Sequence, residues 1–258
     1  MAPRDKVEIA SVDGHNVERM GFFCYKSKPK SPGYQRKLKW LRRRFAEGMR
    51  MHILYENGRS AGFIEYMPGE YGWRAVNAAD YLLIHCLWVV GRGKGKGYGS
   101  RLLDLCETEA RRQGRAGVAM VTSGGNWLAG KDVLLRRGYE AVDSAPPSFE
   151  LLTKRLGEGP RPSFPTDWDD RANRFGPGLT VLRTDQCPYL DDAVSHALNA
   201  ASERGLPARE VLLESAEEVR EKSPSAYGVF ALVLDGRLLS YHYVLAKELV
   251  ALLDRSPG

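Results

Sequence analysis

The sequence predicts an α+β domain with a mixed central sheet and helices on both sides, followed by a small α/β domain. A glycine-rich loop at residues 91–99 joins a buried strand to a helix. Residues 1–160 hold 27 Lys and Arg against 17 Asp and Glu, whereas residues 161–258 hold 11 against 15. This asymmetry indicates two units with different partners. A stretch rich in Pro and Gly at residues 158–178 separates them.

Composition limits the classes that the protein can belong to. We expect one domain at residues 1–157, a linker at 158–178 and a second domain at 179–258. Of the 258 residues, 43% are hydrophobic and 27% charged, as in globular proteins with a real core. No apolar run reaches the roughly 20 residues of a membrane helix, and the N-terminus lacks a signal-peptide core. Four scattered cysteines without C-x-x-C spacing argue against zinc and disulfides. We therefore expect a cytoplasmic protein without a metal.

The first domain is expected to open with a strand and a basic amphipathic helix. Apolar residues Tyr34, Leu38, Leu41 and Phe45 follow one helical stripe, and bases fill the other face. A hairpin with a type I′ turn is predicted at Asn57-Gly58. The remaining elements are expected as strands around 73–90 and at 116–123, 139–144 and 149–156, and helices at 100–114 and 127–138.

The second domain is expected to alternate strands and helices. The predicted order is strand 179–185, a turn, a helix from about Asp191 that Gly205 ends, strand 208–215, helix 216–222, a hairpin turning at Asp235-Gly236, and helix 246–255.

The glycine-rich loop predicts a phosphate site. Glycines before a helix N-terminus present uncrowded backbone N–H groups at the positive end of the helix dipole. The loop "GRGKGKGYGS" fits neither the dinucleotide fingerprint nor the G-x-x-x-x-G-K-[ST] loop. It does place Lys94, Gly97 and Gly99 ahead of Leu102-Leu103. In this spacing it resembles the pyrophosphate loop of the GNAT acyltransferases, which bind acetyl-CoA there.

The resemblance extends beyond the loop. The segment "KDVLLRRGYE" is similar to the GNAT segment in which a short helix ends on Gly-Phe, here Gly138-Tyr139. Many GNAT enzymes have a tyrosine four residues earlier, which protonates the departing CoA thiolate. Here that position is Leu134, and neither Tyr98 nor Tyr139 is an obvious substitute. The stretches "GFIEYMPGEYGWRAV", "YLLIHCLWVV", "PPSFELL", "DQCPY" and "YGVFALVLDG" are similar to the YoaP-type GNAT proteins, which add a C-terminal YoaP domain.

The resemblance implies an N-acyltransferase that uses acetyl-CoA, or another acyl-CoA, and a small-molecule amine. Two alternatives remain open, namely transfer from an aminoacyl-tRNA or carrier-bound donor, and a module that binds CoA without turnover. The basic helix around Arg42, Arg43 and Arg44 is either a solvated face or a phosphate contact, including an RNA backbone. The residues expected to contact CoA are Trp88, Val89, Val90, Lys94, Gly95, Lys96, Gly97, Tyr98, Gly99, Ser100 and Asn126.

Three residues before the loop are candidates for catalysis. Acyl transfer needs a neutral amine, so a base must lie near the acyl group. Glu65 is a carboxylate in an apolar strand, and His85 is a side chain whose ordinary pKa is close to neutrality. Strand alternation predicts His85 on the face of Leu87, with Cys86 on the opposite face. The alternatives are a surface glutamate, a core histidine and a packing cysteine. Tyr66, Trp73 and Cys187 are expected to contact substrate.

The turn at Cys187-Pro188-Tyr189-Leu190 looks like that of a thioredoxin or glutaredoxin, in which a second cysteine follows the tyrosine. Leu190 stands at that position, so the resolving thiol is absent. We therefore expect a thioredoxin-like domain without dithiol chemistry. It serves either as a structural or docking domain or through Cys187 as a single thiol.

Overall fold

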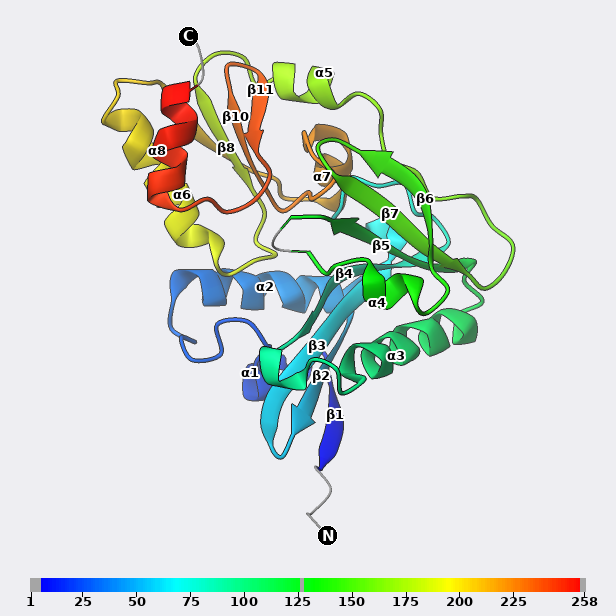
Figure 1. The fold of residues 1–258 in the computed structure, drawn as a ribbon. Helices are drawn as coiled ribbons and strands as arrows, with labels where there is room; N and C mark the ends of the chain where they lie inside the picture. Colours follow the sequence, from blue (N-terminus) through cyan, green and yellow to red (C-terminus); the bar gives the residue numbers. More distant parts are fainter. Residues whose placement is uncertain (1–5, 126–127, 256–258) are drawn as a thin grey trace. The chain divides into compact units, whose positions relative to one another are not determined.

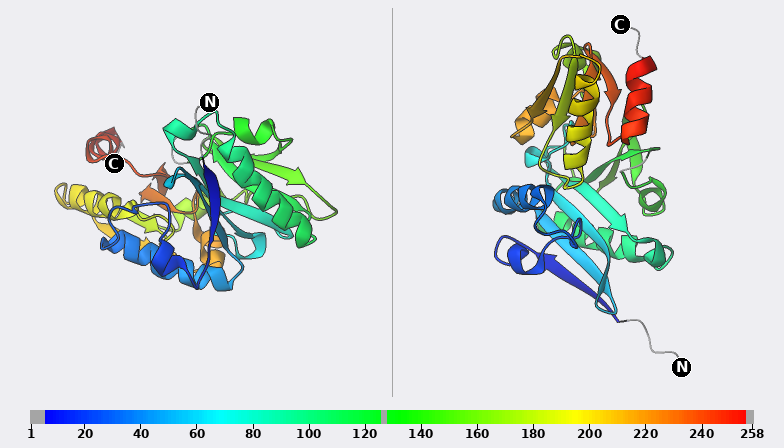
Figure 2. Two further views of the ribbon diagram at one scale, coloured as in Figure 1. Left: turned by 90° about the horizontal axis from the view of Figure 1, so that it is seen from below. Right: turned by 90° about the vertical axis from the view of Figure 1, so that its left-hand side faces the viewer.

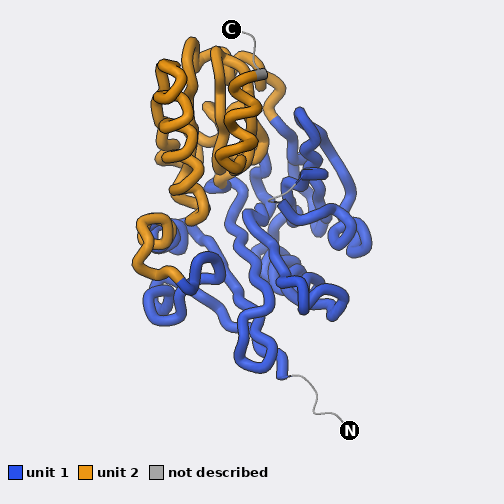
Figure 3. Tube along the Cα trace, turned by 60° about the vertical axis from the view of Figure 1, so that its left-hand side comes forward, with its two compact units in different colours: residues 1–27, 38–72, 77–164 blue, residues 28–37, 73–76, 165–258 orange. Residues whose placement is uncertain are grey.

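Two compact units divide the chain in the computed structural model, which describes residues 6–125 and 128–255. The first unit comprises residues 1–27, 38–72 and 77–164, and the second comprises 28–37, 73–76 and 165–258 (Figure 3). The change from Phe164 to Pro165 falls inside the expected linker. That the two short segments at 28–37 and 73–76 belong to the second unit was not predicted from the sequence. The expected domain boundaries stay a prediction.

The first unit is built on a seven-stranded sheet in the order β1-β2-β3-β4-β5-β7-β6 (Figure 1). Its strands are β1 Val7–Val12, β2 Arg50–Glu56, β3 Arg59–Pro68, β4 Tyr81–Val89, β5 Gly117–Ser123, β6 Glu140–Ala145 and β7 Phe149–Arg155. Neighbouring strands are antiparallel except β4 and β5, which are parallel. The predicted mixed sheet is therefore confirmed.

Helices cover both faces of this sheet, as the sequence predicts. The helices of this part of the chain are α1 Val17–Met20, α2 Pro32–Ala46, α3 Tyr98–Arg112 and α4 Asp132–Leu135, with 3-10 turns at Gly69–Tyr71 and Gly91–Gly93. Helix α3 lies on one face, and α1 with residues 38–46 of α2 lies on the other (Figure 2). A core cluster joins α3 to the sheet through side chains such as Leu54, Ile64, Leu102 and Cys106.

Two predicted elements are shorter than expected. The strand expected around residues 73–90 begins only at Tyr81, because residues 73–76 form bends and Asp80 adopts a left-handed backbone conformation (φ 64°). The helix expected at 127–138 is reduced to α4, which begins only at Asp132; Trp127 lies outside the described residues. Gly138 (φ 78°) follows the end of α4, where the sequence predicts the end of the helix.

Helix α2 begins and ends at recognisable residues. The Ser31 hydroxyl accepts the N–H of Tyr34 (3.3 Å), and Pro32 takes the first position, where its missing N–H costs nothing. Gly48 follows the end of the helix with φ 94°. The predicted apolar stripe is buried at Tyr34 and Leu41.

The basic residues of α2 do not all lie on a solvated face. Lys37 and Arg44 are buried. Arg44 pairs with Glu47 (2.8 Å) and lies over the Trp40 ring (5.8 Å from its centroid). Arg42 pairs with Glu18 at the surface. The exposed positive charge of this helix is therefore smaller than its sequence suggests.

Both predicted hairpin turns are type I′. The central residues have positive φ, with 50° and 75° at Asn57-Gly58 and 48° and 74° at Asp235-Gly236. This is the combination that a type I′ turn requires. The first turn joins β2 to β3, so its position sets which residues of these strands face each other.

The second unit contains a four-stranded sheet in the order β11-β10-β8-β9. Its elements are α5 Trp168–Asn173, β8 Leu179–Arg183, α6 Leu190–Ser202, β9 Ala208–Leu212, α7 Ala216–Lys222, β10 Phe230–Leu234, β11 Arg237–Ser240 and α8 Ala246–Arg255. Strands β8 and β9 are parallel and the other pairs antiparallel. From β8 onward this order is the expected one, and α5 is an addition in the connector. Whether the unit is thioredoxin-like stays a prediction. Across 6–125 and 128–255, no helix has the length and apolarity needed to cross a bilayer.

A chain of polar contacts lies on the α3 face of the first sheet. The Ser11 hydroxyl and the His52 Nδ1 are 3.0 Å apart, and His52 Nε2 is 3.1 Å from the Tyr66 hydroxyl. Burial lowers the pKa of His52 below its ordinary value, with Glu109 opposing and Arg50 reinforcing the shift. Tyr66, which was expected to bind substrate, is therefore a buried partner of His52.

The His52 shift predicts an acid-sensitive stability. Because the pKa of His52 is lower in the folded chain, the unfolded chain binds more protons near pH 6.5. The contribution of neutral His52 is present above about pH 6.5 and is lost as pH falls towards the folded-state pKa. We expect His52→Gln to lose less stability than wild type between pH 7 and pH 5 in thermal unfolding. The control is His15→Gln at an exposed position, and parallel pH curves for wild type and His52→Gln would contradict the assignment.

Candidate functional site

Strands β4 and β5 separate before they end. Their parallel register runs from the pair Tyr81 and Gly117 to the pair Ile84 and Met120. Strand β4 continues to Val89, yet within the described residues no register with β5 extends past Met120. The sheet therefore opens between the two strands, and the edge of β4 at residues 85–89 faces this opening. An exposed strand edge can take an extended ligand as an additional strand.

A β-bulge accompanies the separation. On the β3 side, Glu65 is opposite Cys86, whereas the next residue, Tyr66, is opposite Ile84. His85 is therefore the extra residue on β4. A bulge bends its strand and strengthens the local twist, which is why β4 turns away from β5 at this point.

The bulge corrects the predicted faces of β4. Ile84 and Leu87 both belong to the core cluster under α3. His85 instead lies near α2, with its ring centroid 6.5 Å from that of Trp40. A bulge places two consecutive residues, here His85 and Cys86, where regular alternation along the strand would place one. His85 therefore does not share the face of Leu87, and Cys86 lies on the same face as His85.

Glu65 lies on the same face as His85. Its neighbours Ile64 and Tyr66 both belong to the cluster under α3, so alternation along β3 points Glu65 to the other face. The residue is 3% exposed, which is unusual for a glutamate. The surface-glutamate alternative is therefore wrong. The two strands bring Glu65, His85 and Cys86 to one face beside the opening.

The glycine-rich loop begins where β4 ends. Gly95 and Gly97 have φ of 79° and 76°, a backbone region that other residues rarely adopt. The N–H groups of Lys94 and Lys96 donate to the carbonyls of Gly91 and Gly93 (3.2 and 3.3 Å), which are inside the loop. The N–H groups at residues 97–100 precede the first hydrogen bond of α3, which Arg101 donates to the Gly97 carbonyl (3.1 Å), so they are placed to serve a ligand.

At two positions of this loop, neither the backbone conformation nor the neighbouring atoms require a glycine. Neither Gly91 nor Gly99 has a positive φ. A Cβ added at Gly91 would meet nothing within 4 Å, and one at Gly99 would meet only Val133 and Val89 at 3.6 and 3.9 Å. Open space at a bare helix N-terminus fits a ligand whose phosphates approach the backbone closely.

Comparison with known proteins identifies the family. The model of the acetyltransferase (GNAT) family matches residues 18–126. The uncharacterized N-acetyltransferase YoaP of Bacillus subtilis (strain 168) is 30% identical over 222 residues, which cover 84% of this chain and 86% of that protein. The chain belongs to the GNAT acetyltransferase family. It is therefore an acyltransferase of the N-acetyltransferase type.

Solved structures of acetyltransferases are also similar to the chain. The PaiA N-acetyltransferase of Thermoplasma acidophilum, in complex with coenzyme A, is 15% identical with a TM-score of 0.42, over 58% of this chain and 99% of that one. An acetyltransferase of Thermus thermophilus is 16% identical with a TM-score of 0.40, over 58% and 97%.

The chain has no hydroxyl at the position where many GNAT enzymes have a tyrosine that protonates the CoA thiolate. Leu134 is fully buried in the core cluster under α3. The Tyr98 hydroxyl donates to Glu56, and burial raises the pKa of Tyr139 far above its ordinary value. Neither phenol is therefore placed to give up a proton readily.

A pocket of about 880 Å³ borders the opening. Thr122 and Ser123 line it from the end of β5, past the point where β5 leaves β4. Lys131 and Glu150 contribute an ion pair (2.7 Å), and Ser148 from the β6–β7 turn lies 3.1 Å from Ser123 between their hydroxyl oxygens. The pocket thus combines polar side chains with apolar surface, and it was not predicted, because its residues come from three separate elements.

The other residues expected to bind CoA are distributed along the same edge. Trp88 is half exposed at the end of β4, and the Val90 N–H donates to the Ala61 carbonyl (2.9 Å). Asn126 lies outside the described residues. Across the described chain, no group of three or more His, Cys, Asp or Glu side chains could hold a metal ion.

In the second unit, the Cys-Pro-Tyr turn packs against the start of α2. A Cβ added at Gly33 would lie 2.3 Å from the Pro188 carbonyl oxygen, so only glycine allows this approach. Cys187 is half-buried and is the single cysteine of this unit. Trp73, also expected to bind substrate, is buried, and its carbonyl accepts from Gln186 Nε2 (3.1 Å).

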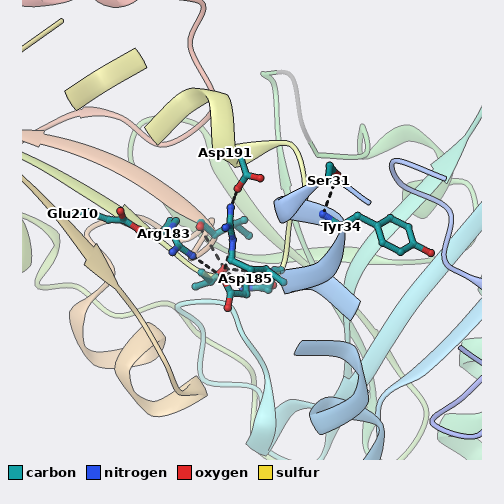
Figure 4. A network of polar contacts seen from close by, with 10 residues as sticks. Ser31, Tyr34, Arg183, Asp185, Asp191 and Glu210 are labelled. Carbon is teal, nitrogen blue, oxygen red and sulfur yellow. Dashed lines mark hydrogen bonds and ion pairs between the residues drawn. The ribbon is translucent and has the colours of Figure 1, made fainter. Parts of the chain in front are cut away.

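Ion pairs hold the same contact (Figure 4). Arg36 of α2 pairs with Asp191 at the start of α6, and its Nε lies 3.8 Å from Asp185. Arg183 of β8 pairs with Asp185 (2.5 Å) and with Glu210 of β9. These pairs flank Cys187 on both sides along the chain.

We expect Gly33→Ala to destabilise the protein although alanine is the better helix former. Alanine favours a helix interior over glycine by about 1 kcal/mol. Overpacking a filled site costs about 1–3 kcal/mol, and here the new methyl group meets a backbone oxygen that cannot rotate away. The midpoint of thermal unfolding should therefore fall, whereas Lys39→Ala at an exposed site of the same helix should leave it nearly unchanged. A higher midpoint for Gly33→Ala would show that the contact with Pro188 is absent in solution.

Proposed function

We propose that the chain transfers the acetyl group of acetyl-CoA to an amine of a small molecule. The observation that carries the proposal is the succession along one stretch of chain of an open strand edge, a bare glycine loop and a helix N-terminus. The open strand edge suits an extended acyl-pantetheine arm, and the glycine loop with the helix N-terminus suits a pyrophosphate. The edge of β4 at residues 85–89 would receive the arm, and the N–H groups at 97–100 the phosphates.

The pocket beside the opening supports a small acceptor. Its volume of about 880 Å³ lies within the range of about 300–1,000 Å³ typical of small-molecule sites. Its lining combines hydroxyls and the Lys131–Glu150 pair with the apolar surface of residues such as Phe149, which suits an amine that carries both polar and apolar groups. Thr122 and Ser123 line the pocket beside the opening, so an acceptor held there would lie close to an acyl group held by β4.

The chemistry assigns proton handling to the face of Glu65 and His85. Bound acetyl-CoA supplies a thioester whose carbonyl carbon an amine attacks, with a thiolate as leaving group. The amine attacks only when neutral, so a base must take its proton. Glu65 and His85 share the face beside the opening, whereas Leu134 cannot exchange a proton. Cys86 stays a candidate on the same face, with packing as its alternative role.

The glycine loop gives the first test of this proposal. Gly99→Val should reduce CoA affinity at least tenfold in isothermal titration, because the side chain would fill the space left for phosphate. Since Gly99 has an ordinary φ and open surroundings, the fold should persist. Gly14→Val is the matched control, because its Cβ would meet only Phe45 at 3.8 Å. Unchanged CoA affinity in Gly99→Val would remove the pyrophosphate from this loop.

The proton-transfer residues give the second test. With an acceptor found by screening amino acids and polyamines for release of free CoA, kcat/KM is measured against pH for Glu65→Gln, His85→Ala and Cys86→Ser. Loss of the base should lower the rate by about 10²–10⁴ with CoA affinity intact. A general base works only when it is unprotonated, so the variant that loses the rise in rate on the acidic limb of the pH profile identifies the group. Near-wild-type rates in all three variants would leave the reaction to proximity alone.

A further inference from the structure

A buried carboxylate lies next to the glycine loop. Glu56 is the last residue of β2, directly before the Asn57-Gly58 turn, and its side chain is 8% exposed. A glutamate beside a turn is normally solvated, because burial of a charge is unfavourable unless the charge is paired. Two partners of Glu56 come from the loop and from the helix that follows it.

One carboxylate oxygen of Glu56 accepts hydrogen bonds from the residues on both sides of Gly97. The Lys96 ammonium donates to Glu56 Oε1 at 2.5 Å, and the Tyr98 hydroxyl donates to the same oxygen. Lys96 belongs to the loop, and Tyr98 is the first residue of α3. Gly97 between them has φ 76° and could otherwise rotate freely. Glu56 thus fixes the point at which the loop becomes a helix.

The same hairpin also holds the beginning of the loop. The Arg92 guanidinium donates to the Ser60 carbonyl (3.1 Å), and the Val90 N–H donates to the Ala61 carbonyl (2.9 Å). These contacts use the main chain of β3. The contacts of Glu56, in contrast, use a side-chain carboxylate as the acceptor. A substitution of Glu56 can therefore remove them without altering the main chain of the hairpin.

The charges of this cluster explain why a carboxylate is tolerated beside a phosphate site. An unpaired carboxylate would repel a pyrophosphate, whereas the Glu56–Lys96 pair is neutral as a whole. The Lys96 ammonium is consequently directed to Glu56 and away from a ligand. Binding of phosphate then depends on the position of the N–H groups at 97–100, which Glu56 fixes.

We infer that Glu56 is a positioning residue, which holds the glycine loop and the first turn of α3 in the conformation that receives the pyrophosphate of CoA. The inference rests on the proposed function. It assigns to Glu56 no contact with substrate and no step of proton transfer. Its effect should appear in the binding of donors that carry a pyrophosphate and in no other property of the reaction.

The test compares two acyl donors in Glu56→Gln. We expect about tenfold weaker CoA binding and a higher KM for acetyl-CoA, with kcat at saturation within about twofold of wild type. For acetyl-pantetheine, which has no pyrophosphate, kcat/KM should be unchanged. A general loss of structure would lower kcat/KM for both donors. Glu18→Gln, which removes an exposed carboxylate paired with Arg42, is the matched control.

Two further variants keep the test decisive. Tyr98→Phe removes one donor to Glu56 without touching the carboxylate, and it should show the same discrimination between donors if Glu56→Gln fails to fold. Lys96→Met should weaken CoA binding as Glu56→Gln does, and the double variant should be no worse than either, because both break one unit. Unchanged or tighter CoA binding in Glu56→Gln overturns the inference. Failure of wild type to bind CoA overturns the proposed function instead.

Discussion

One extra residue in β4 sets the geometry of the first unit. The bulge at His85 bends β4 away from β5 after Ile84, and the same insertion turns His85 and Cys86 towards the face of α2. The opening of the sheet and the gathering of candidate catalytic side chains thus have a single cause. Without the bulge, β5 would pair with the rest of β4, and no strand edge would remain at the centre of the sheet.

The glycine loop has open space around two of its glycines, but contacts with neighbouring residues hold its backbone in place. Gly91 and Gly99 leave space that nothing in the protein fills, while Glu56, Ser60 and Ala61 hold the loop to the β2–β3 hairpin. A binding site whose donors are fixed before the ligand arrives loses less conformational entropy on binding. The lack of side chains in the loop therefore does not make the loop flexible, because its contacts with the β2–β3 hairpin hold its backbone in place.

The sequence predicted the features that local chemistry determines. The order of strands and helices apart from α1 and α5, the positions of the two hairpin turns and the glycine loop follow from short patterns of residue types. The bulge at His85 could not be predicted, because counting faces along β4 assumes an unbroken period of two. Glu56 was missed, since a glutamate before Asn-Gly normally indicates a solvated turn. Gly33 carried a usable signal: a glycine inside a helix is unfavourable without a close contact, here Pro188.

The two units are interleaved along the chain, because residues 28–37 and 73–76 belong to the unit whose other residues begin at 165. No single cut releases the second unit whole. A fragment that starts at the connector would lack Gly33 and Arg36 at the Cys-Pro-Tyr turn, and it would lack Arg74, which donates to Gln186 (2.6 Å). The same order applies during synthesis on the ribosome, where chains emerge from the N-terminus. The start of α2 leaves the ribosome long before its partners in the second unit exist, so the chain can complete this unit only after residues 165–258 have been synthesised.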